Sequence, residues 1–493
     1  MQIPKEIQFI ISKLRENEHE AYIVGGCVRD ILRNIEPQDW DIATNAKPEE
    51  IIKLFAKSFY ENKFGTVTVL TGSENPKLKE VEITPYRIDE KYTDKRHPDK
   101  IRWAKNLKQD LARRDFTVNA IAMEIQPPYG RPNLLIIDPF KGQRDLKNKI
   151  IRAVGKADDR FSEDALRMLR AVRFAVTLSP DVIWQIEEKT ARAVQKNANF
   201  LKFISQERIR DELIKIINSS LAARGIEMLR RLGLLKYILP ELEQGFGVWQ
   251  NKHHIYQVYQ HALLSLNYAC QQNFSKYVRW AALLHDIAKP KTKRGEGPEA
   301  TFYGHEVVGA KMTKIILQRL RFPKKEIEKI VKLVACHLFY YNVNEVGESS
   351  VRKLLRKVGK ENIDQLLQVR YADRVGSGVP KAEPYKLRHL KYLIEKLSQD
   401  PISVKMLKVN GNDVMKLLNI KSSPKVGQVL DVLLGQVLAD PKKNKKNILE
   451  KEIKKLGKLA EKELISLANK ARKEREQIEI KRDQMTKQKY WVT

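Results

Sequence analysis

The chain has 493 residues, of which 42% are hydrophobic, and its 92 Lys and Arg against 61 Asp and Glu give a formal net charge of +31. This length is too great for one hydrophobic core and predicts about three or four domains. No apolar run approaches the roughly 18 residues that span a bilayer, and residues 1–20 have the pattern of an amphipathic helix rather than a signal peptide. We therefore expect a cytoplasmic protein with no membrane partner.

The excess of positive charge favours a polyanionic partner such as nucleic acid, although a basic, solvated tail over 441–493 contributes to it. Cys27, Cys270 and Cys336 are far apart and form no CxxC pair, which argues against a disulfide framework or a thiolate zinc site. The oligomeric state is not indicated.

Residues 20–140 alternate short β-branched runs with helical stretches such as 47–59. The runs predicted as strands are 21–26, 39–44, 65–71, 79–87 and 133–140. This pattern predicts an α/β (α+β) head with a small mixed sheet. Almost every later segment has helical periodicity, so a long all-α body should follow the head.

Two aspartates, Asp39 and Asp41, lie two positions apart in the run predicted as a strand over 39–44. Residues i and i+2 of a strand share a face, so two like charges would meet there unless a cation separates them. Paired carboxylates hold Mg²⁺ where a hydroxyl attacks and pyrophosphate leaves. Glu82, on another predicted strand, is a candidate third carboxylate. A DxD pair by itself is also common on surface strands.

A double glycine precedes this strand, between a strand and a helix start. Gly25 and Gly26 would bring backbone N–H groups against phosphate oxygens, and Arg29 lies one turn into the helix. An ordinary strand-to-helix turn with Asp30 paired to Arg29 explains the same residues. Further along, polar residues stand among apolar ones, which is costly unless a ligand uses them; they are Arg113, Arg114, Asp115 and Asn119.

Residues 162–175 predict a helix with Ser162 as its N-cap and with Asp164 and Arg167 as i,i+3 neighbours. A surface salt bridge accounts for such a pair. In a nucleotide site, however, the carboxylate would accept from an exocyclic amine and the guanidinium would donate to the adjacent ring nitrogen. Cytosine and adenine satisfy that arrangement, whereas guanine and uracil present carbonyl oxygen beside ring N–H. Such a pair would select C and A.

Five segments in order resemble the motifs of the class II tRNA nucleotidyltransferases, which are the CCA-adding enzymes and their poly(A) polymerase relatives. They are GGCVRD (25–30), DWD (39–41), RRDFTVNA (113–120), IDPFKGQRDL (137–146) and FSEDALRMLRAVRF (161–174), and the likeness spans roughly the first 240 residues. The resemblance implies that Gly25, Gly26 and Arg29 hold the triphosphate, that Asp39 and Asp41 bind Mg²⁺, and that Arg114, Asp115 and Asn119 contact the nucleotide. It also implies base selection by Asp164 and Arg167, with Arg170 and Arg173 on the nucleotide.

Six of the nine histidines fall between 253 and 337: His253, His254, His261, His285, His305 and His337. With Asp286 and Asp373, the order His261, His285-Asp286, Asp373 resembles an HD-type phosphohydrolase domain, and His305 and His337 resemble the further ligands of two-metal variants. The resemblance implies a divalent transition metal there. Singly, each histidine is more often a satisfied core residue.

The expected organisation is a head (1–150), a helical neck that carries the nucleotide template and RNA-binding region (151–245), an HD-type domain (246–380) and a C-terminal tRNA-binding region with a basic tail (381–493). The expected activity is CCA addition to tRNA from CTP and ATP with release of pyrophosphate. The polar segment 86–110 is typical of relatives that add A. Two alternatives stay open: an A-adding or poly(A) enzyme, and an HD phosphohydrolase whose head only binds RNA.

Overall fold

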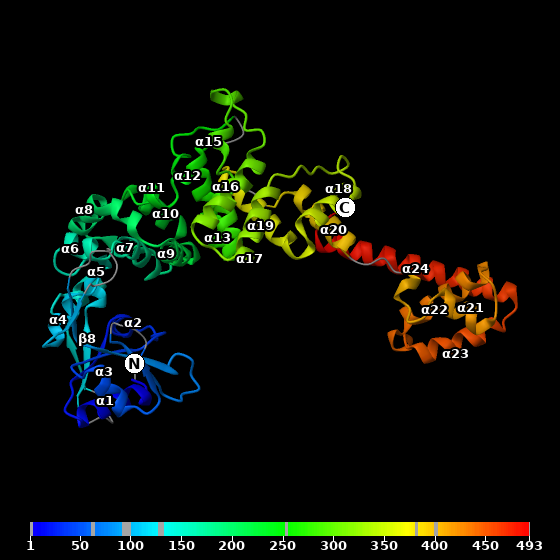
Figure 1. Cartoon of the computed structure of the whole chain (residues 1–493). Coiled ribbons are helices and arrows are strands. Elements are labelled where there is room, and N and C mark those ends of the chain that lie inside the picture. The colour runs from blue at the N-terminus through cyan, green and yellow to red at the C-terminus, as the bar shows by residue number, and fades with distance from the viewer. Residues whose placement is uncertain are drawn as a thin grey trace. The chain divides into compact units, whose positions relative to one another are not determined.

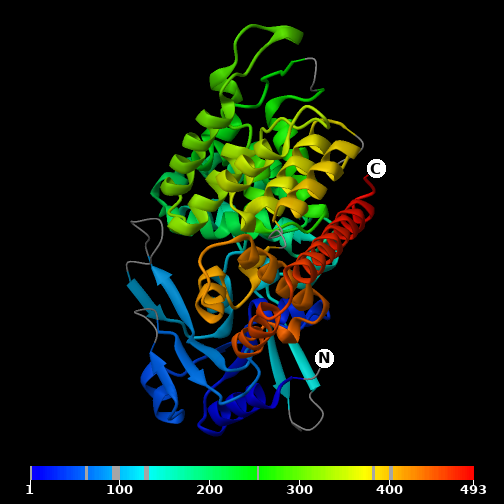
Figure 2. The ribbon, with the colours of Figure 1, turned by 90° about the vertical axis from the view of Figure 1, so that its right-hand side faces the viewer.

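The computed structural model describes residues 3–60, 65–90, 100–126, 133–251, 255–379, 383–398 and 403–492. The chain divides into two compact units, Met1–Leu338 with Asp364–Ala382, and Phe339–Ile363 with Glu383–Thr493. Figures 1 and 2 show a sheet only in the blue and cyan N-terminal part, followed by helices, as the sequence predicts. In the described part of the chain, no helix is both long and apolar enough to cross a membrane.

The head is built on a seven-stranded sheet in the order β3-β4-β5-β2-β1-β8-β9. Its strands are β1 (Ala21–Val24), β2 (Asp41–Thr44), β3 (Ser58–Tyr60), β4 (Val67–Leu70), β5 (Glu80–Pro85), β8 (Ala122–Gln126) and β9 (Asn133–Ile137). β2 and β5 run parallel and the other neighbours antiparallel, so the predicted mixed sheet is confirmed. The β2–β5 register pairs Asp41 with Glu82.

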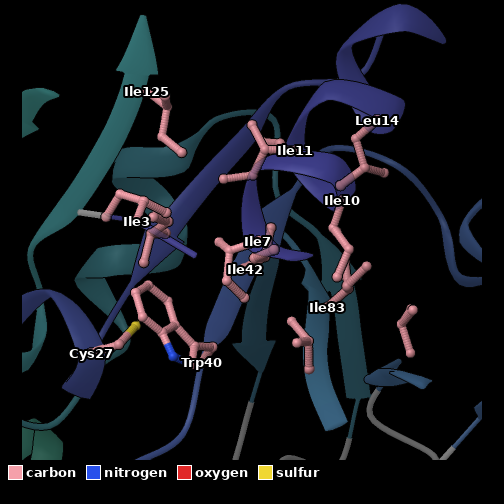
Figure 3. Close-up of a cluster of buried hydrophobic side chains, with 14 of the residues drawn as sticks. Ile3, Ile7, Ile10, Ile11, Leu14, Cys27, Trp40, Ile42, Ile83 and Ile125 are labelled. Carbon is pink, nitrogen blue, oxygen red and sulfur yellow. The ribbon is translucent and has the colours of Figure 1, made fainter. Parts of the chain in front are cut away.

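Helix α1 (Lys5–Glu16) covers one face of this sheet. Its buried side chains, Ile7, Ile10, Ile11 and Leu14, recur at i, i+3, i+4 and i+7, which is the pattern of one helical face. Figure 3 shows them beside Ile42 and Ile83 of the sheet, and all belong to one apolar cluster. This core supports the sheet from one face, and the polar residues of the candidate site lie at the ends of its inner strands β1 and β2.

Several head elements differ from the sequence prediction. The helix predicted over 47–59 ends early as α3 (Pro48–Leu54), because Ser58–Tyr60 pairs with β4 as the edge strand β3. Strand β8 was not predicted from the sequence. In the segment 86–110, β6 (Arg87–Glu90) and β7 (Lys100–Trp103) form an antiparallel ribbon; residues 91–99 lie outside the described part. The other head helices are α2 (Gly26–Leu32), α4 (Leu107–Ala112), η1 (Thr117–Asn119) and α5 (Gly142–Asn148).

The helix predicted from Ser162 is two helices. α6 (Ala157–Glu163) ends and α7 (Leu166–Thr177) begins on either side of Asp164. Ser162 therefore lies inside α6 and is not an N-cap, and Asp164 is not an i,i+3 partner of Arg167 within one helix. Asp164 has extended backbone (φ −135°, ψ 105°), and its side chain accepts from the Leu166 N–H, which favours the break.

The rest of the first unit is helical apart from a small ribbon of β10 (Ile150–Ile151) and β11 (Gln185–Ile186). Its helices are α8 (Glu188–Asn197), η2 (Ala198–Phe203), α9 (Gln206–Asn218), α10 (Ala222–Arg231), α11 (Leu235–Ile238), α12 (Pro240–Glu243), α13 (Val258–Gln271), α14 (Lys276–Leu284), α15 (Lys289–Thr292), η3 (Gly297–Glu299), α16 (His305–Arg319), α17 (Lys324–Cys336) and α19 (Ile363–Gly376). The long all-α body is thus confirmed.

The second unit holds a separate apolar cluster centred on α22 and α23. Its helices are α18 (Glu348–Val358), η4 (Lys360–Asn362), α20 (Tyr385–Ser398), η5 (Val404–Met406), α21 (Gly411–Leu418), α22 (Pro424–Ala439), η6 (Pro441–Lys443), α23 (Lys446–Gly457) and α24 (Glu461–Lys489). Residues 339–363, assigned from the sequence to the HD-type domain, group with this unit.

Candidate active site and metal centre

The turn between β1 and α2 requires glycine at position 25. Gly25 has φ +81°, and a Cβ there would lie 2.6 Å from Nη1 of Arg114. Its N–H donates to the Ile121 carbonyl at 3.2 Å. Gly25 therefore lets the Arg114 guanidinium approach the turn, and its own amide is already bonded. The Nε of Arg114 is buried with no hydrogen-bond partner in the described chain, as expected of a group that meets a ligand.

Carboxylates gather where β2 begins. Asp41 is the first residue of β2 and half-buried, whereas exposed Asp39 precedes the strand, so the prediction that one strand carries both is wrong. The parallel register instead places Asp41 and Glu82 side by side on neighbouring strands. Burial raises the pKa of Asp41; Arg114 opposes this and the Asp39 charge adds to it. Asp41 and Glu82 thus offer carboxylate oxygens from neighbouring strands, and oxygen is the donor that Mg²⁺ prefers.

The segment 110–119 forms a network of buried charges. Asp110 is fully buried and pairs with Arg113 at 2.7 Å and with Arg114 at 3.4 Å. Burial raises the pKa of the Asp110 carboxyl, but the two guanidinium groups outweigh this and hold it below its usual value. Asp110 thus fixes the position of Arg114, although the sequence analysis did not select it; its place one turn before the arginine pair is the signal that was available.

Asp115 links the head to the neck. Its carboxylate accepts from Asn119 Nδ2 at 3.0 Å and from Arg170 Nε, on α7, at 2.7 Å. Burial would raise the pKa of Asp115, but Arg170 and Asn119 hold it well below its ordinary value. Arg29 donates to Asn119 Oδ1 at 2.8 Å and also pairs with Asp30 at 2.9 Å. The structure therefore joins four of the predicted nucleotide-binding residues.

Three guanidinium groups surround the ring of Phe174. Those of Arg29, Arg170 and Arg173 lie 5.4, 5.3 and 3.9 Å from its centroid. Arg173 also pairs with the buried Glu212 of α9 at 2.7 Å. Burial lowers the pKa of Arg173, and Glu212 opposes that shift. Arginines that the sequence placed in separate motifs thus lie together around one buried aromatic ring.

The side chains of the two residues predicted to select the base do not pair with each other, although the Arg167 N–H donates to the Asp164 carbonyl at 3.1 Å. Asp164 accepts from Arg208 on α9 at 2.7 and 3.3 Å. Arg167 donates to Glu163 at 2.6 Å and to the Arg113 carbonyl at 3.1 Å. Both stand at the break between α6 and α7, and the contact with Arg113 places Arg167 against the head segment that carries Arg114.

A second polar cluster is buried in the helical body. His261 lies on α13, His285 and Asp286 follow directly on α14, and Asp373 lies on α19. Nε2 of His261 is 2.9 Å from Nε2 of His285, 3.2 Å from Asp286 Oδ2 and 3.3 Å from Asp373 Oδ1. The tertiary fold therefore brings together all four residues of the predicted order.

Two further histidines lie near Oδ1 of Asp286, the carboxylate oxygen that does not contact His261. Nε2 of His305 is 3.3 Å and Nε2 of His337 is 3.8 Å from Asp286 Oδ1. His261, His285 and Asp286 form one set with metal-ligand spacing, and Asp286, His305 and His337 form another. Nδ1 of His305 and of His337 each contacts a backbone carbonyl at 2.7 Å, which directs Nε2 to the cluster. His253 and His254 lie outside the described residues.

Charges around this cluster fit a bound cation. Burial would lower the pKa of His285, but Asp286 and Asp373 raise it to about 10, so the two carboxylates favour positive charge at this position. Burial, with His285 beside it, lowers the pKa of His337 to about 3, which keeps this imidazole neutral as a ligand must be. Lys289 pairs with Asp286 at 2.7 Å and was not among the predicted site residues, although its i,i+3 spacing from Asp286 is visible in the sequence.

Three stretches of the chain match known family models. Residues 21–152 match the poly(A) polymerase head domain, residues 184–246 match a probable RNA- and SrmB-binding site of the polymerase, and residues 252–377 match the HD domain. With the mixed sheet and the helical body, these matches define a nucleotidyltransferase that carries an HD domain. Both kinds of domain generally use divalent metals.

The relatives narrow this class to one family. The chain is 33% identical over 436 residues to the A-adding tRNA nucleotidyltransferase of Deinococcus radiodurans, covering 85% of this chain and 92% of that one. It is also 49% identical to a CCA-adding enzyme of Lactobacillus delbrueckii over 208 residues. That match covers 42% of this chain and 48% of the relative, which is about half of its length. A crystal structure of the Bacillus stearothermophilus CCA-adding enzyme with CTP aligns with 92% of this chain and 98% of that one, at a TM-score of 0.54 and 26% identity. The chain belongs to the class II CCA-adding enzyme and poly(A) polymerase family, and it is a nucleotidyltransferase.

Proposed function

We propose that this protein transfers nucleotides from CTP and ATP to the 3′ end of tRNA and releases pyrophosphate. The observation that carries the proposal is the contact of Arg167 with the Arg113 carbonyl, because the break between α6 and α7, which would select the base, lies beside the segment that carries Arg114. Base choice and phosphoryl chemistry would then act on one bound nucleotide.

Each group has a part in this reaction. Asp39, Asp41 and Glu82 would hold Mg²⁺, which when bound activates the terminal hydroxyl and offsets the charge of the leaving pyrophosphate. Gly26, Arg29 and Arg114 would hold the triphosphate beside the turn that Gly25 forms, and Asp115 with Asn119 would orient the sugar. Arg170 and Arg173 would contribute positive charge from α7. Asp164 and Arg167 would read the amino group and ring nitrogen shared by cytosine and adenine.

Addition of the terminal A alone is the second candidate. It is favoured because the relative matched along 85% of this chain is an A-adding enzyme, whereas the CCA-adding relative of Lactobacillus delbrueckii is matched along 42%. Poly(A) synthesis is the third candidate function, since it uses the same nucleotidyl-transfer chemistry. The three differ only in which RNA end and which nucleotide they accept.

We predict that substrate ends separate these readings. Purified protein would be incubated with Mg²⁺, CTP or ATP alone, and tRNA ending before the first C, after C or after CC; extension is read on a denaturing gel. CCA addition predicts extension of the first two by CTP and of the third by a single A. Extension of the CC-ended tRNA alone means A addition, and long A tracts on unrelated RNA mean poly(A) synthesis. If no end is extended, the proposal is wrong.

The rest of the chain would serve the same substrate. We propose the division into head (1–150), neck (151–245), HD-type domain (246–380) and C-terminal region (381–493), the last of which would bind tRNA. The 29-residue helix α24 supports this role with its many Lys and Arg side chains, because phosphate contacts supply most of the affinity for RNA.

We further propose that His261, His285, Asp286 and Asp373 bind a divalent transition metal, with His305 and His337 as ligands of a second ion. Imidazole and carboxylate donors suit such ions, and hydrolysis of a phosphate ester is the reaction expected of them. This centre shares no residue with the carboxylate site of the head. Its metal should therefore be removable without loss of nucleotide addition.

The metal centre gives a direct prediction. His285→Gln should lose most of the transition metal that co-purifies with the wild-type protein, measured by elemental analysis, and addition of A should continue at a similar rate. His389→Gln is the matched control, because His389 lies in the second unit, beside Tyr341, Tyr385 and Tyr392. Equal metal content in wild type and His285→Gln would contradict the assignment.

A further inference from the structure

The carboxylate of Asp164 is held by three donors. Oδ1 accepts from the Leu166 N–H at 3.0 Å and from Arg208 Nη1 at 3.3 Å, and Oδ2 accepts from Arg208 Nη2 at 2.7 Å. Both side chains are mostly buried, with exposed fractions of 15% for Asp164 and 26% for Arg208. An ionised carboxylate offers about four acceptor positions, so these contacts leave about one for a ligand.

Arg208 is itself firmly placed. It lies on α9, and Glu212 one turn later pairs with Arg173, so one face of α9 holds two residues that flank the nucleotide position on α7. Arg279 of α14 donates to the carbonyls of residues 217, 218 and 219 at 3.1, 2.8 and 3.1 Å, which fixes the C-terminal end of α9. The guanidinium therefore meets Asp164 from a helix that is anchored along its length.

We propose that Arg208 is a positioning residue that determines base specificity. By holding both oxygens of Asp164, it keeps this side chain an acceptor in one orientation, so that an amino group is accepted and a carbonyl oxygen is rejected. This inference rests on the proposed function, in which Asp164 reads the base. It assigns to Arg208 a contact with Asp164 rather than with the nucleotide itself.

The physical reason is the hydrogen-bonding capacity of a carboxyl group. Without the guanidinium, the side chain retains only the Leu166 N–H and is free to rotate. A carboxylate that turns away from the base no longer sets an acceptor against the carbonyl oxygen of guanine or uracil. Discrimination against these bases should fall, while the phosphoryl chemistry, which uses other residues, continues.

The test measures kcat/KM for ATP and for GTP on a tRNA that ends in CC. In Arg208→Met we expect the ratio of kcat/KM for ATP to kcat/KM for GTP to fall about 10- to 100-fold. The reason is that the guanine carbonyl no longer meets a fixed acceptor at Asp164, so one mismatched polar contact is removed. Arg208→Lys keeps the charge and one donor, so its ratio should lie between those of wild type and Arg208→Met. It also serves as the test variant if thermal unfolding shows that the methionine variant does not fold.

Arg319→Met is the matched control. Arg319 makes a comparable two-armed pair with Glu241, and their exposed fractions are 34% and 17%. Its loss should cost similar stability and leave the ratio unchanged. A double variant, Asp164→Ala with Arg208→Met, should discriminate no worse than Asp164→Ala alone, because Arg208 acts through Asp164.

The outcomes separate the inference from the proposed function. If wild type does not extend tRNA, or if Asp164→Ala discriminates as well as wild type, base reading by Asp164 is wrong. If Asp164→Ala loses discrimination and Arg208→Met keeps it, the role of Arg208 is wrong. A further loss in the double variant, or an equal loss in Arg319→Met, would also overturn it, because both would indicate a general structural effect.

Discussion

Replacing Asp41 by Asn should reduce nucleotide addition by about 1,000-fold or more. Loss of a carboxylate that holds a catalytic metal removes several kcal/mol of transition-state stabilisation, and each 1.36 kcal/mol is a factor of ten. The fold should survive, because burial and Asp39 already disfavour the charged form of Asp41 and the neutral amide removes that repulsion. Incorporation of labelled AMP into a CC-ended tRNA, with circular dichroism of the same sample, measures both effects.

Glu36→Gln is the control for charge. Glu36 is an exposed carboxylate in the same connection, paired with Lys77 at 2.7 Å, and its loss should change activity little. If Asp41→Asn still incorporates AMP at the wild-type rate, the assignment of the head as the catalytic site is wrong. It would favour the alternative of a phosphohydrolase whose head only binds RNA.

Replacing Arg170 by Met should destabilise the protein by about 3 kcal/mol and abolish nucleotide binding. Asp115 would remain buried without the guanidinium that pairs with it at 2.6 Å, and an uncompensated buried charge costs several kcal/mol. The expected loss of unfolding free energy is at the low end of that range, because the Arg170 side chain is 34% exposed and water screens part of the interaction. Denaturant unfolding at pH 7 measures the first effect, and equilibrium binding of ATP measures the second.

The loss of stability should depend on pH in a definite direction. In the wild type, Arg170 helps to hold the pKa of Asp115 well below its usual value, so the pair stabilises the fold above the pKa of the unfolded carboxyl and this contribution fades as the pH falls. In Arg170→Met, the buried carboxyl can bind a proton in mild acid. The difference between variant and wild type should therefore be greatest near pH 7 and smaller near pH 4.

Arg192→Met provides the comparison for this measurement. Arg192 pairs with Glu188 on α8, and both side chains are about three-quarters exposed. Such a surface pair contributes at most about 1 kcal/mol. A loss in Arg170→Met no larger than that in Arg192→Met, or one that does not change with pH, would show that Asp115 is stabilised by its other contacts.

The segments of the head were predictable because their patterns are local. Alternation of apolar residues indicated β1, β2, β4, β5 and β9, and the spacing of Ile7, Ile10, Ile11 and Leu14 indicated α1. The errors arose where a distant partner decides the conformation. The short edge strand β3 forms only because β4 lies beside it, and the helix predicted from Ser162 breaks at Asp164, where Arg208 and the Leu166 N–H hold the side chain.

The sequence by itself determined the family, the order of the motifs, the mixed sheet followed by a helical body, and the residue types of both polar sites. The tertiary structure decided which of these residues meet. It placed Asp41 beside Glu82 on neighbouring strands. It formed ion pairs between Asp115 and Arg170 and between Asp164 and Arg208, rather than between Asp164 and Arg167. The reason is that motifs and periodicity depend on neighbours along the chain, whereas ion pairs depend on distances between elements that only the packed fold sets.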